Sequence, residues 1–238
     1  DPRDGERYDT ITAEVRLQGR TGKLDHLIGA YFGRENIASR DSYQVGTSFE
    51  SYANLLGSGL IPLATGLPLG RNYPVGTGIL DNFKQHATDF AVFTHDIYDV
   101  TDRISVALGA RYTTESKSLD ASITSNNPGC SAAVAAHGVN LTGIPSSLQG
   151  VVCIPNLDPR YDGTYSTSRS EGNWSGIASL NGKIAENLNA YVSYSRGYKG
   201  GGFQLDRSGM DPAAPALPQL RFRAETADSY EAGVKGAT

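Results

Sequence analysis

Polar and apolar residues alternate along much of this chain with a period of two, which is typical of β-strands that have one wet face. Between residues 8 and 19, Ile11, Val15 and Leu17 fall on one face, and threonine, glutamate and arginine fall on the other. The segment 103–122 begins with the most regular alternation in the chain. About ten such residues are what a tilted strand needs to cross a bilayer.

The same alternation predicts seven long strands, separated by connections of very unequal length. The strands are expected at 8–19, 24–35, 88–98, 103–122, 173–184, 188–199 and 224–236, and long loops at 36–87, 123–172 and 200–223. The other connections are tight turns. Short and long connections thus alternate along the chain, and in an up-and-down meander this alternation places all long loops at one end of the sheet. Outer-membrane barrels have the same arrangement, with short periplasmic turns and long external loops.

The predicted fold is therefore all-β: an antiparallel up-and-down meander, with residues 1–238 forming an incomplete piece of a transmembrane β-barrel. Seven strands alone would leave two unpaired edges, which lipid does not tolerate. The segment 88–98 is apolar on both faces, so its outward side stays open. The alternative fold is a one-sided sheet in a soluble or surface-anchored adhesin, whose loops would form a binding module.

Composition agrees with a β-rich protein and excludes some partners. The chain contains 28 Gly and 13 Tyr, against 7 Phe and 1 Trp. A net charge of −4 with interspersed charges lacks the basic patch that nucleic-acid binding requires. No apolar stretch reaches the 18 or more residues of a transmembrane helix. We therefore expect outer-membrane lipid as a partner, contacted through strands, and no nucleic acid.

The two cysteines, Cys130 and Cys153, lie in one long loop rich in Gly, Pro, Ser and Asn. With His137 between them, a zinc site would still lack a fourth ligand. We therefore predict a disulfide and no metal site, and a disulfide indicates an oxidising compartment.

No catalytic constellation is found in the sequence. The stretch Gly172–Gly176 has the wrong spacing for a serine nucleophile elbow, and the histidines form no pair at metal-ligand spacing. The run Gly197–Gly202 lacks the order of a phosphate loop, and we interpret it as a bend at the outer rim. We expect no enzyme activity and no cofactor; a barrel hydrolase remains a remote alternative.

Aromatic residues fall into two groups. Trp174, Tyr112 and Tyr194 are expected in the interfacial girdles of a barrel. Other aromatic residues lie deep in the loops or at a strand-to-loop junction, where they would either stack on a ligand or pack the loops. The candidate ligand-binding residues are Tyr43, Phe49, Tyr52, Tyr73, Tyr161, Tyr165, Tyr198, Lys199 and Phe203.

Four short motifs resemble the barrel strands of the TonB-dependent outer-membrane receptors. They are Tyr191–Phe203 (YVSYSRGYKGGGF), Ala13–Leu17 (AEVRL), Leu108–Thr113 (LGARYT), and Glu225 followed by Ser229–Lys235 (SYEAGVK). They occur in the order found in the family. The resemblance implies about a third of a barrel of about 22 strands, without the family's N-terminal plug and TonB box.

The resemblance also implies a function and a location. Receptors of this family lie in the bacterial outer membrane and import a scarce small-molecule solute, such as a siderophore, vitamin or oligosaccharide. TonB, which acts through the plug of the full-length protein, supplies the energy. The resemblance does not identify the solute.

Overall fold

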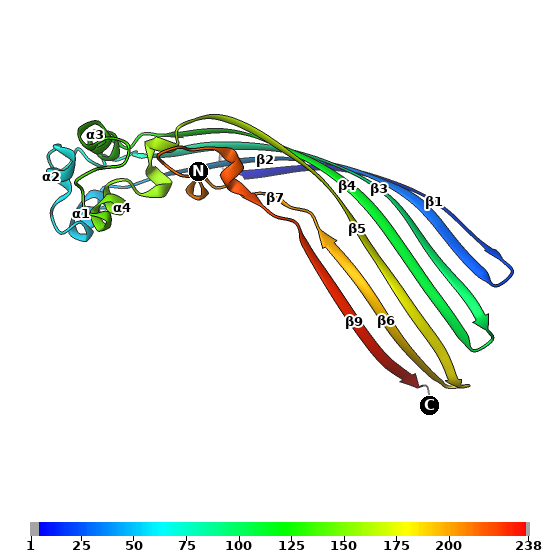
Figure 1. The fold of residues 1–238 in the computed structure, drawn as a ribbon. Coiled ribbons are helices and arrows are strands. Elements are labelled where there is room, and N and C mark those ends of the chain that lie inside the picture. Colours follow the sequence, from blue (N-terminus) through cyan, green and yellow to red (C-terminus); the bar gives the residue numbers. More distant parts are fainter. Residues whose placement is uncertain (1–4, 237–238) are drawn as a thin grey trace.

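The computed structural model describes residues 5–236, in which long strands form a single antiparallel sheet (Figure 1). Its seven strands are β1 (Gly5–Thr21), β2 (Leu24–Gln44), β3 (Gly78–Thr101), β4 (Ile104–Ser125), β5 (Gly163–Ala185), β6 (Leu188–Lys199) and β9 (Glu225–Gly236). They pair in that order, each with its neighbour along the chain. The ends of the expected segment 1–238, at 1–4 and 237–238, lie outside the described residues.

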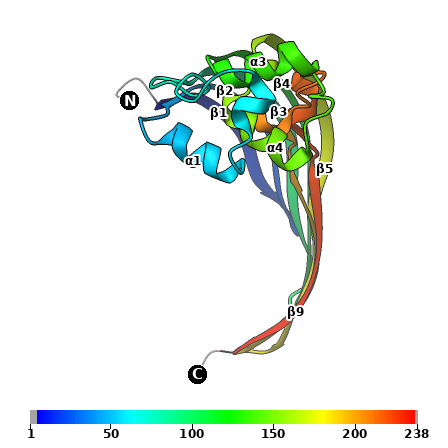
Figure 2. The ribbon, with the colours of Figure 1, turned by 90° about the vertical axis from the view of Figure 1, so that its left-hand side faces the viewer.

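This topology confirms the predicted meander. The sheet does not close, and β1 and β9 form its two edges. The three tight turns lie together at one end of the sheet, and the long connections gather at the other (Figure 1). The sheet is curved along its strands below the loops (Figure 2).

Five strands extend further towards the loops than the sequence predicts, among them β1, which begins at Gly5 instead of residue 8. β2 continues to Gln44 and pairs with β3, which already begins at Gly78. Likewise β4 continues to Ser125, and β5 begins at Gly163. The expected loops 36–87 and 123–172 therefore shrink to 45–77 and 126–162. The added strand segments were missed because many of their residues are polar on both faces, so that they lack the alternation of a half-apolar strand.

The loops contain regular structure of their own. The first holds α1 (Phe49–Leu56) and α2 (Ile61–Thr65), and the second holds α3 (Pro128–His137) and α4 (Ser146–Val152). The third holds the short strands β7 (Gly202–Phe203) and β8 (Arg221–Phe222). Turns of 3₁₀-helix lie at Pro155–Leu157, Pro159–Tyr161, Arg207–Gly209 and Leu217–Leu220. Among the described residues, no helix is both long and apolar enough to span a membrane.

The helices of the first two loops share one apolar core, which ties them into a cap beyond the end of the sheet (Figure 1). We call residues 45–77 and 126–157 the helical cap. Its buried apolar residues are Val45, Ala53, Ile61, Ala64, Tyr73, Cys130, Ala133, Leu141, Ile144, Leu148, Val152, Cys153 and Leu157. The loops are therefore a packed unit.

The strand register brings apolar residues of all seven strands onto one face of the sheet, which we call the outer face. They form a continuous apolar band of Ile11, Ala13, Val15, Leu17, Ile28, Ala30, Phe32, Phe90, Val92, Val106, Leu108, Ala110, Tyr112, Trp174, Ala178, Leu180, Val192, Tyr194, Tyr230, Ala232 and Val234. The register also settles the side of 88–98 that the sequence left open. Phe90 lies opposite Phe32 and Val92 opposite Ala30, so both face outward.

Aromatic rings meet in pairs on the outer face towards the loop end of the band. The rings of Tyr112 and Trp174 lie 5.0 Å apart, and those of Tyr194 and Tyr230 lie 5.1 Å apart. Such rings are expected where hydrocarbon meets water. Their positions agree with the girdle predicted for Trp174, Tyr112 and Tyr194.

Candidate functional site

The opposite face of the sheet, which we call the inner face, carries charged residues where the outer face is apolar or hydroxylated. On β4, Lys117 Nζ lies 2.7 Å from a Glu115 carboxylate oxygen. On β5, a guanidinium nitrogen of Arg169 lies 2.5 Å from the Glu171 carboxylate. All four side chains are largely buried, because the third loop lies against them. We call these four residues the charged row.

The backbone of the third loop forms hydrogen bonds with the charged row. The Gly201 N–H donates to Glu171 Oε1 at 2.6 Å, and Lys117 Nζ donates to the Gly201 carbonyl at 2.8 Å. A Cβ on Gly200 would collide with the Glu115 carboxylate, and a Cβ on Gly201 would collide with the Arg169 guanidinium. The glycines that we interpreted as a bend are therefore needed here for close backbone approach.

Beyond the charged row, the third loop packs against apolar side chains of the inner face. Phe83 of β3 and Leu119 and Ile123 of β4 are fully buried under it. The rest of this cluster consists of Ala121, Tyr161, Phe203, Met210, Leu217 and Leu220. The loop-end part of the inner wall is thus covered by the chain's own third loop.

A buried arginine anchors the third loop to this wall. Arg207 is only 1% exposed, and its Nε donates to Asp81 Oδ2 of β3 at 2.8 Å. A second guanidinium nitrogen also pairs with Asp81 and donates to the Thr124 carbonyl at 2.8 Å. The Asp162 carboxylate lies 3.8 Å away. One side chain therefore joins the third loop to β3, to β4 and to the end of the second loop.

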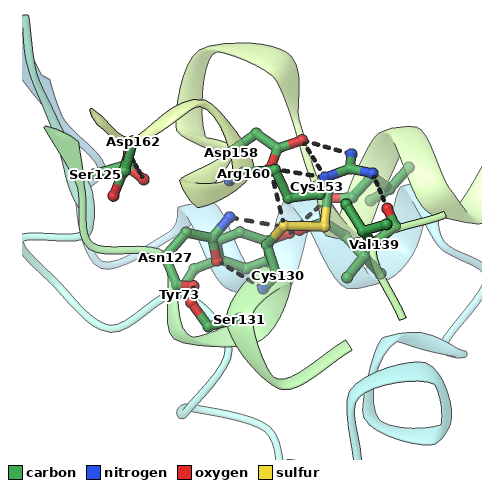
Figure 3. The surroundings of a disulfide bond; sticks show 12 residues. Tyr73, Ser125, Asn127, Cys130, Ser131, Val139, Cys153, Asp158, Arg160 and Asp162 are labelled. Atoms are coloured by element: carbon green, nitrogen blue, oxygen red, sulfur yellow. Dashed lines mark hydrogen bonds and ion pairs between the residues drawn. A yellow bond between two sulfur atoms is a disulfide. The ribbon is translucent and has the colours of Figure 1, made fainter. Parts of the chain in front are cut away.

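The predicted disulfide is present and lies in the core of the helical cap (Figure 3). Cys130 in α3 and Cys153, directly after α4, have Cα atoms 4.8 Å apart. Asp158 lies beside them and pairs with the Arg160 guanidinium at 2.5 Å, which in turn donates to the Val139 carbonyl at 2.7 Å. The sulfur atoms lie near the Asp158 carboxylate, but they are bonded to each other and do not make a metal-ligand set with it.

Glu50 of α1 organises the first loop from inside the cap. Its carboxylate accepts hydrogen bonds from the backbone N–H groups of Gly70, Asn72 and Tyr73 at 2.7, 3.2 and 3.1 Å. The Asn72 side chain adds a fourth at 3.0 Å. Burial opposes ionisation of Glu50, but the hydrogen bonds from Asn72, Tyr73 and Gly70 outweigh it and lower the pKa.

This network predicts that the helical cap loosens in acid. Folding lowers the pKa of Glu50, so the ionised carboxylate stabilises the cap at pH values above the unfolded pKa of about 4.5. That stability is lost as the pH falls through the folded pKa. Protease resistance of residues 45–77, measured from pH 7 to pH 3, should fall below about pH 4.5. Glu50→Gln should weaken protection already at pH 7 and remove this step. An unchanged profile in the variant would show that Glu50 does not hold the cap.

The structure divides the nine aromatic and cationic candidates by accessibility. Three of them are buried core residues of the loops: Tyr73, Tyr161 and Phe203. Phe49 packs edge-on against Tyr73 with ring centroids 5.2 Å apart, and the Tyr165 hydroxyl donates to the Tyr161 carbonyl at 2.8 Å. These five residues pack the loops, which was the alternative left open by the sequence.

The other candidates remain accessible in part. Tyr43, at the end of β2, is 39% exposed, and Tyr52 of α1 is 59% exposed. Tyr198 is half-buried at the end of β6. Lys199 is exposed, with its Nζ 3.8 Å from Glu225. The structure does not gather these four residues into one pocket. The sequence analysis did not identify Asp81, Arg207, Glu50 or the charged row.

Comparisons with known proteins agree with this architecture. A family model described as "TonB dependent receptor-like, beta-barrel" matches residues 2–238. No curated protein sequence matches the chain.

Among solved structures, the chain is similar to the ferric yersiniabactin uptake receptor FyuA from Yersinia pestis, with TM-score 0.63 and 14% identity over 98% of this chain and 27% of that one. It is also similar to the siderophore receptor PiuA from Acinetobacter baumannii, with TM-score 0.54 and 14% identity over 96% and 29%. The ferric-catecholate import receptor Fiu from E. coli K12 gives TM-score 0.53 and 15% identity over 97% and 29%. The chain thus spans less than a third of each structure's length, and at these identities the similarity shows the fold alone.

Proposed function

This chain belongs to the TonB-dependent receptor β-barrel family of bacterial outer-membrane proteins, and we propose that it forms part of the wall and external loops of a receptor that imports a scarce solute with energy from TonB. The apolar band on the outer face carries this proposal. It extends over all seven strands, with Thr94 and Asp96 of β3 as polar neighbours of Ala110 and Leu108, and an apolar band of this extent suits a wall in contact with lipid.

The apolar band also argues against the alternative of a soluble adhesin. Most of its large side chains are exposed over seven neighbouring strands, and soluble monomers rarely expose an apolar patch of that extent. The inner face, in contrast, carries the charged row, and its loop-end part is covered by the third loop. This distribution has the polarity expected of a barrel around a polar lumen.

A ferric siderophore is the solute class that we favour. The three similar structures are described as receptors for ferric yersiniabactin, a siderophore and ferric catecholate. In this chain, Tyr43, Tyr52, Tyr198 and Lys199 are the predicted contact residues that keep accessible surface. Aromatic rings suit the apolar parts of such a metal chelate, and an ammonium group suits its anionic oxygens.

Iron uptake by the full-length receptor tests the function. The receptor is expressed in an outer-membrane host that lacks its own siderophore receptors, and uptake of radioactive iron is measured with a panel of ferric siderophores, in strains with and without TonB. We expect uptake of at least one chelate that disappears without TonB. Uptake that persists without TonB would reject energy coupling. If no siderophore is taken up, TonB-dependent uptake of a vitamin or an oligosaccharide from a second panel would change only the solute class.

A lysine in the middle of the apolar band should weaken membrane insertion. Leu108 is the central band residue of β4, and a lysine at bilayer depth costs about 2–4 kcal/mol on the lipid face of a barrel. Ser179 lies opposite Ala107, at the same height on the inner face, and serves as the matched control. The free energy of unfolding is measured for the full-length receptor refolded into lipid vesicles. It should fall clearly in Leu108→Lys and change little in Ser179→Lys. Equal losses would contradict the assignment of the two faces.

The accessible tyrosines should contribute to solute affinity if they contact it. We expect Tyr43→Ala with Tyr52→Ala to weaken solute binding about fivefold or more, which corresponds to about 1 kcal/mol. Tyr230→Ala, an exposed tyrosine of the outer face, is the matched control and should leave binding unchanged. Binding is measured by titrating the purified receptor with the transported chelate. Equal affinities of all three proteins would remove Tyr43 and Tyr52 from the site.

A further inference from the structure

The outer face of β1–β3 becomes cationic directly above the apolar band, on the side of the loops. Arg34 follows the band residue Phe32 on the outward side of β2, and it lies opposite Ile11 and Thr88. Two levels higher on the same face, Arg7 and Lys84 lie opposite Ala38 from its two sides. Arg40 lies beyond them on β2. We call Arg7, Arg34, Arg40 and Lys84 the basic patch.

Acidic groups only partly compensate the basic patch. Arg7 Nε lies 2.9 Å from the Asp9 carboxylate, and both side chains are largely exposed. Asp120 of β4 lies opposite Lys84 in the register. Arg34 is exposed and makes no ion pair with the described residues. Four cations therefore face two carboxylates on this part of the surface.

A cavity lies within the patch. It has a volume of about 290 Å³ and is lined by Arg7, Arg40 and Lys84, together with neighbouring backbone and the edge residue Glu6. The Glu6 carboxylate is already bonded by the Tyr8 hydroxyl at 2.5 Å. The Nε of Arg40 is buried and has no hydrogen-bond partner among the described residues. A buried guanidinium N–H without an acceptor points to a missing anionic or polar ligand.

Rows of hydroxyl groups flank the basic patch at the same level on β4 and β5. Ser116 and Ser170 are hydrogen-bonded across the two strands at 2.9 Å. The other outward residues of these rows are Thr114, Ser118, Ser122, Thr164, Ser166 and Ser168. Hydroxyl groups suit sugars, and the adjoining cations suit phosphates.

We propose that the basic patch binds the phosphate groups of a phosphorylated glycolipid in the outer leaflet. The patch is continuous with the lipid-facing band on the same strands, so lipid anchored beside the band places its headgroup there. Along the strands, Arg34 lies about 7 Å above Phe32, and Lys84 lies about 20 Å above Phe90. The cations thus span the depth of a headgroup with its first sugars. The inference does not depend on which solute the receptor imports.

Retention of defined lipids by the full-length receptor tests this assignment. The purified receptor is freed of lipid in detergent, mixed with bisphosphorylated lipid A, and examined for bound lipid by native mass spectrometry. Dephosphorylated lipid A and phosphatidylcholine are the comparison lipids. The test variant is Arg34→Gln with Lys84→Gln. The matched control is Lys23→Gln with Arg103→Gln, which removes two exposed cations at the opposite end of the strands.

We expect the test variant to retain bisphosphorylated lipid A at least fivefold less than the natural protein and the matched control. Neither comparison lipid should be retained at the level of the bisphosphorylated one. Equal retention of all three proteins, or equal retention of phosphorylated and dephosphorylated lipid A, would overturn the proposal. Heat-modified gel mobility verifies that the barrel is folded, and Arg34→Gln alone, which should give an intermediate loss, replaces the double variant if that does not fold.

Discussion

Replacing Arg207 with methionine should release the third loop from the inner wall, at a cost of about 3–5 kcal/mol. Methionine keeps most of the length of the side chain but removes the charge. The Asp81 carboxylate is buried with Arg207, and the Thr124 carbonyl accepts a hydrogen bond from the same guanidinium. Without Arg207, the buried Asp81 carboxylate loses its main donor, and the part-buried Thr124 carbonyl loses a hydrogen bond. Breaking a buried pair by removing one partner is costly for this reason.

The expected result is local, so the measurement must be local as well. Limited proteolysis of the full-length receptor reports opening of residues 200–224, which should become cleavable in Arg207→Met while the barrel stays folded. Arg221→Met is the matched control. Arg221 belongs to the same loop and donates to the Ser168 carbonyl at 2.6 Å, but it is exposed, so its loss should have a small effect.

A double variant distinguishes the effect of the broken Arg207–Asp81 ion pair from that of a general packing defect. Arg207→Met with Asp81→Leu removes the unpaired charge together with its partner, and it should recover much of the protection lost in the single variant. Full protection of the loop in Arg207→Met would show that the apolar cluster alone holds it. In that case the Arg207–Asp81 pair would not be the anchor.

The sequence predicts the strands best where the two faces of a strand lie in different environments. Along 103–122, Ile104 to Tyr112 alternate because one side faces the apolar surroundings and the other a polar interior. Above the band that contrast ends. Ser116 and Ser170 form a strand pair in which backbone hydrogen bonds, rather than burial of an apolar face, hold the register. Hydropathy alone therefore places the strand ends near the membrane surface, although the strands continue.

The site is less predictable because its contacts are not local. Asp81 and Arg207 are separated by 126 residues, and neither stands in a sequence pattern that indicates a partner. Tyr73 was a reasonable ligand candidate, since it lies in a long polar loop. Its burial depends on the apolar core formed jointly by α1, α2, α3 and α4, which no single segment reveals. Conversely, the cysteines were predictable because only one pairing exists within the chain.

Removing the disulfide should destabilise the helical cap by about 3 kcal/mol and leave the strands paired. The bond closes a loop of 23 residues between α3 and the end of α4, and this restricts the unfolded loop much more than the folded one. Both cysteines are buried in the cap, and neither lies in a strand of the large sheet. The effect should therefore stay within the loops.

The test compares Cys130→Ala with Cys153→Ala against the natural full-length receptor, with and without a reducing agent. Proteolysis of residues 126–162 should accelerate in the double variant, and the reducing agent should accelerate it in the natural protein only. Heat-modified gel mobility should show the barrel intact in both. Loss of the folded barrel on removal of the cysteines would contradict a local role, because it would mean that the cap is needed for the strands to stay paired. If the prediction holds, the cap and the wall are separate units of stability, and Arg207 and the charged row attach only the third loop to the inner face of the wall.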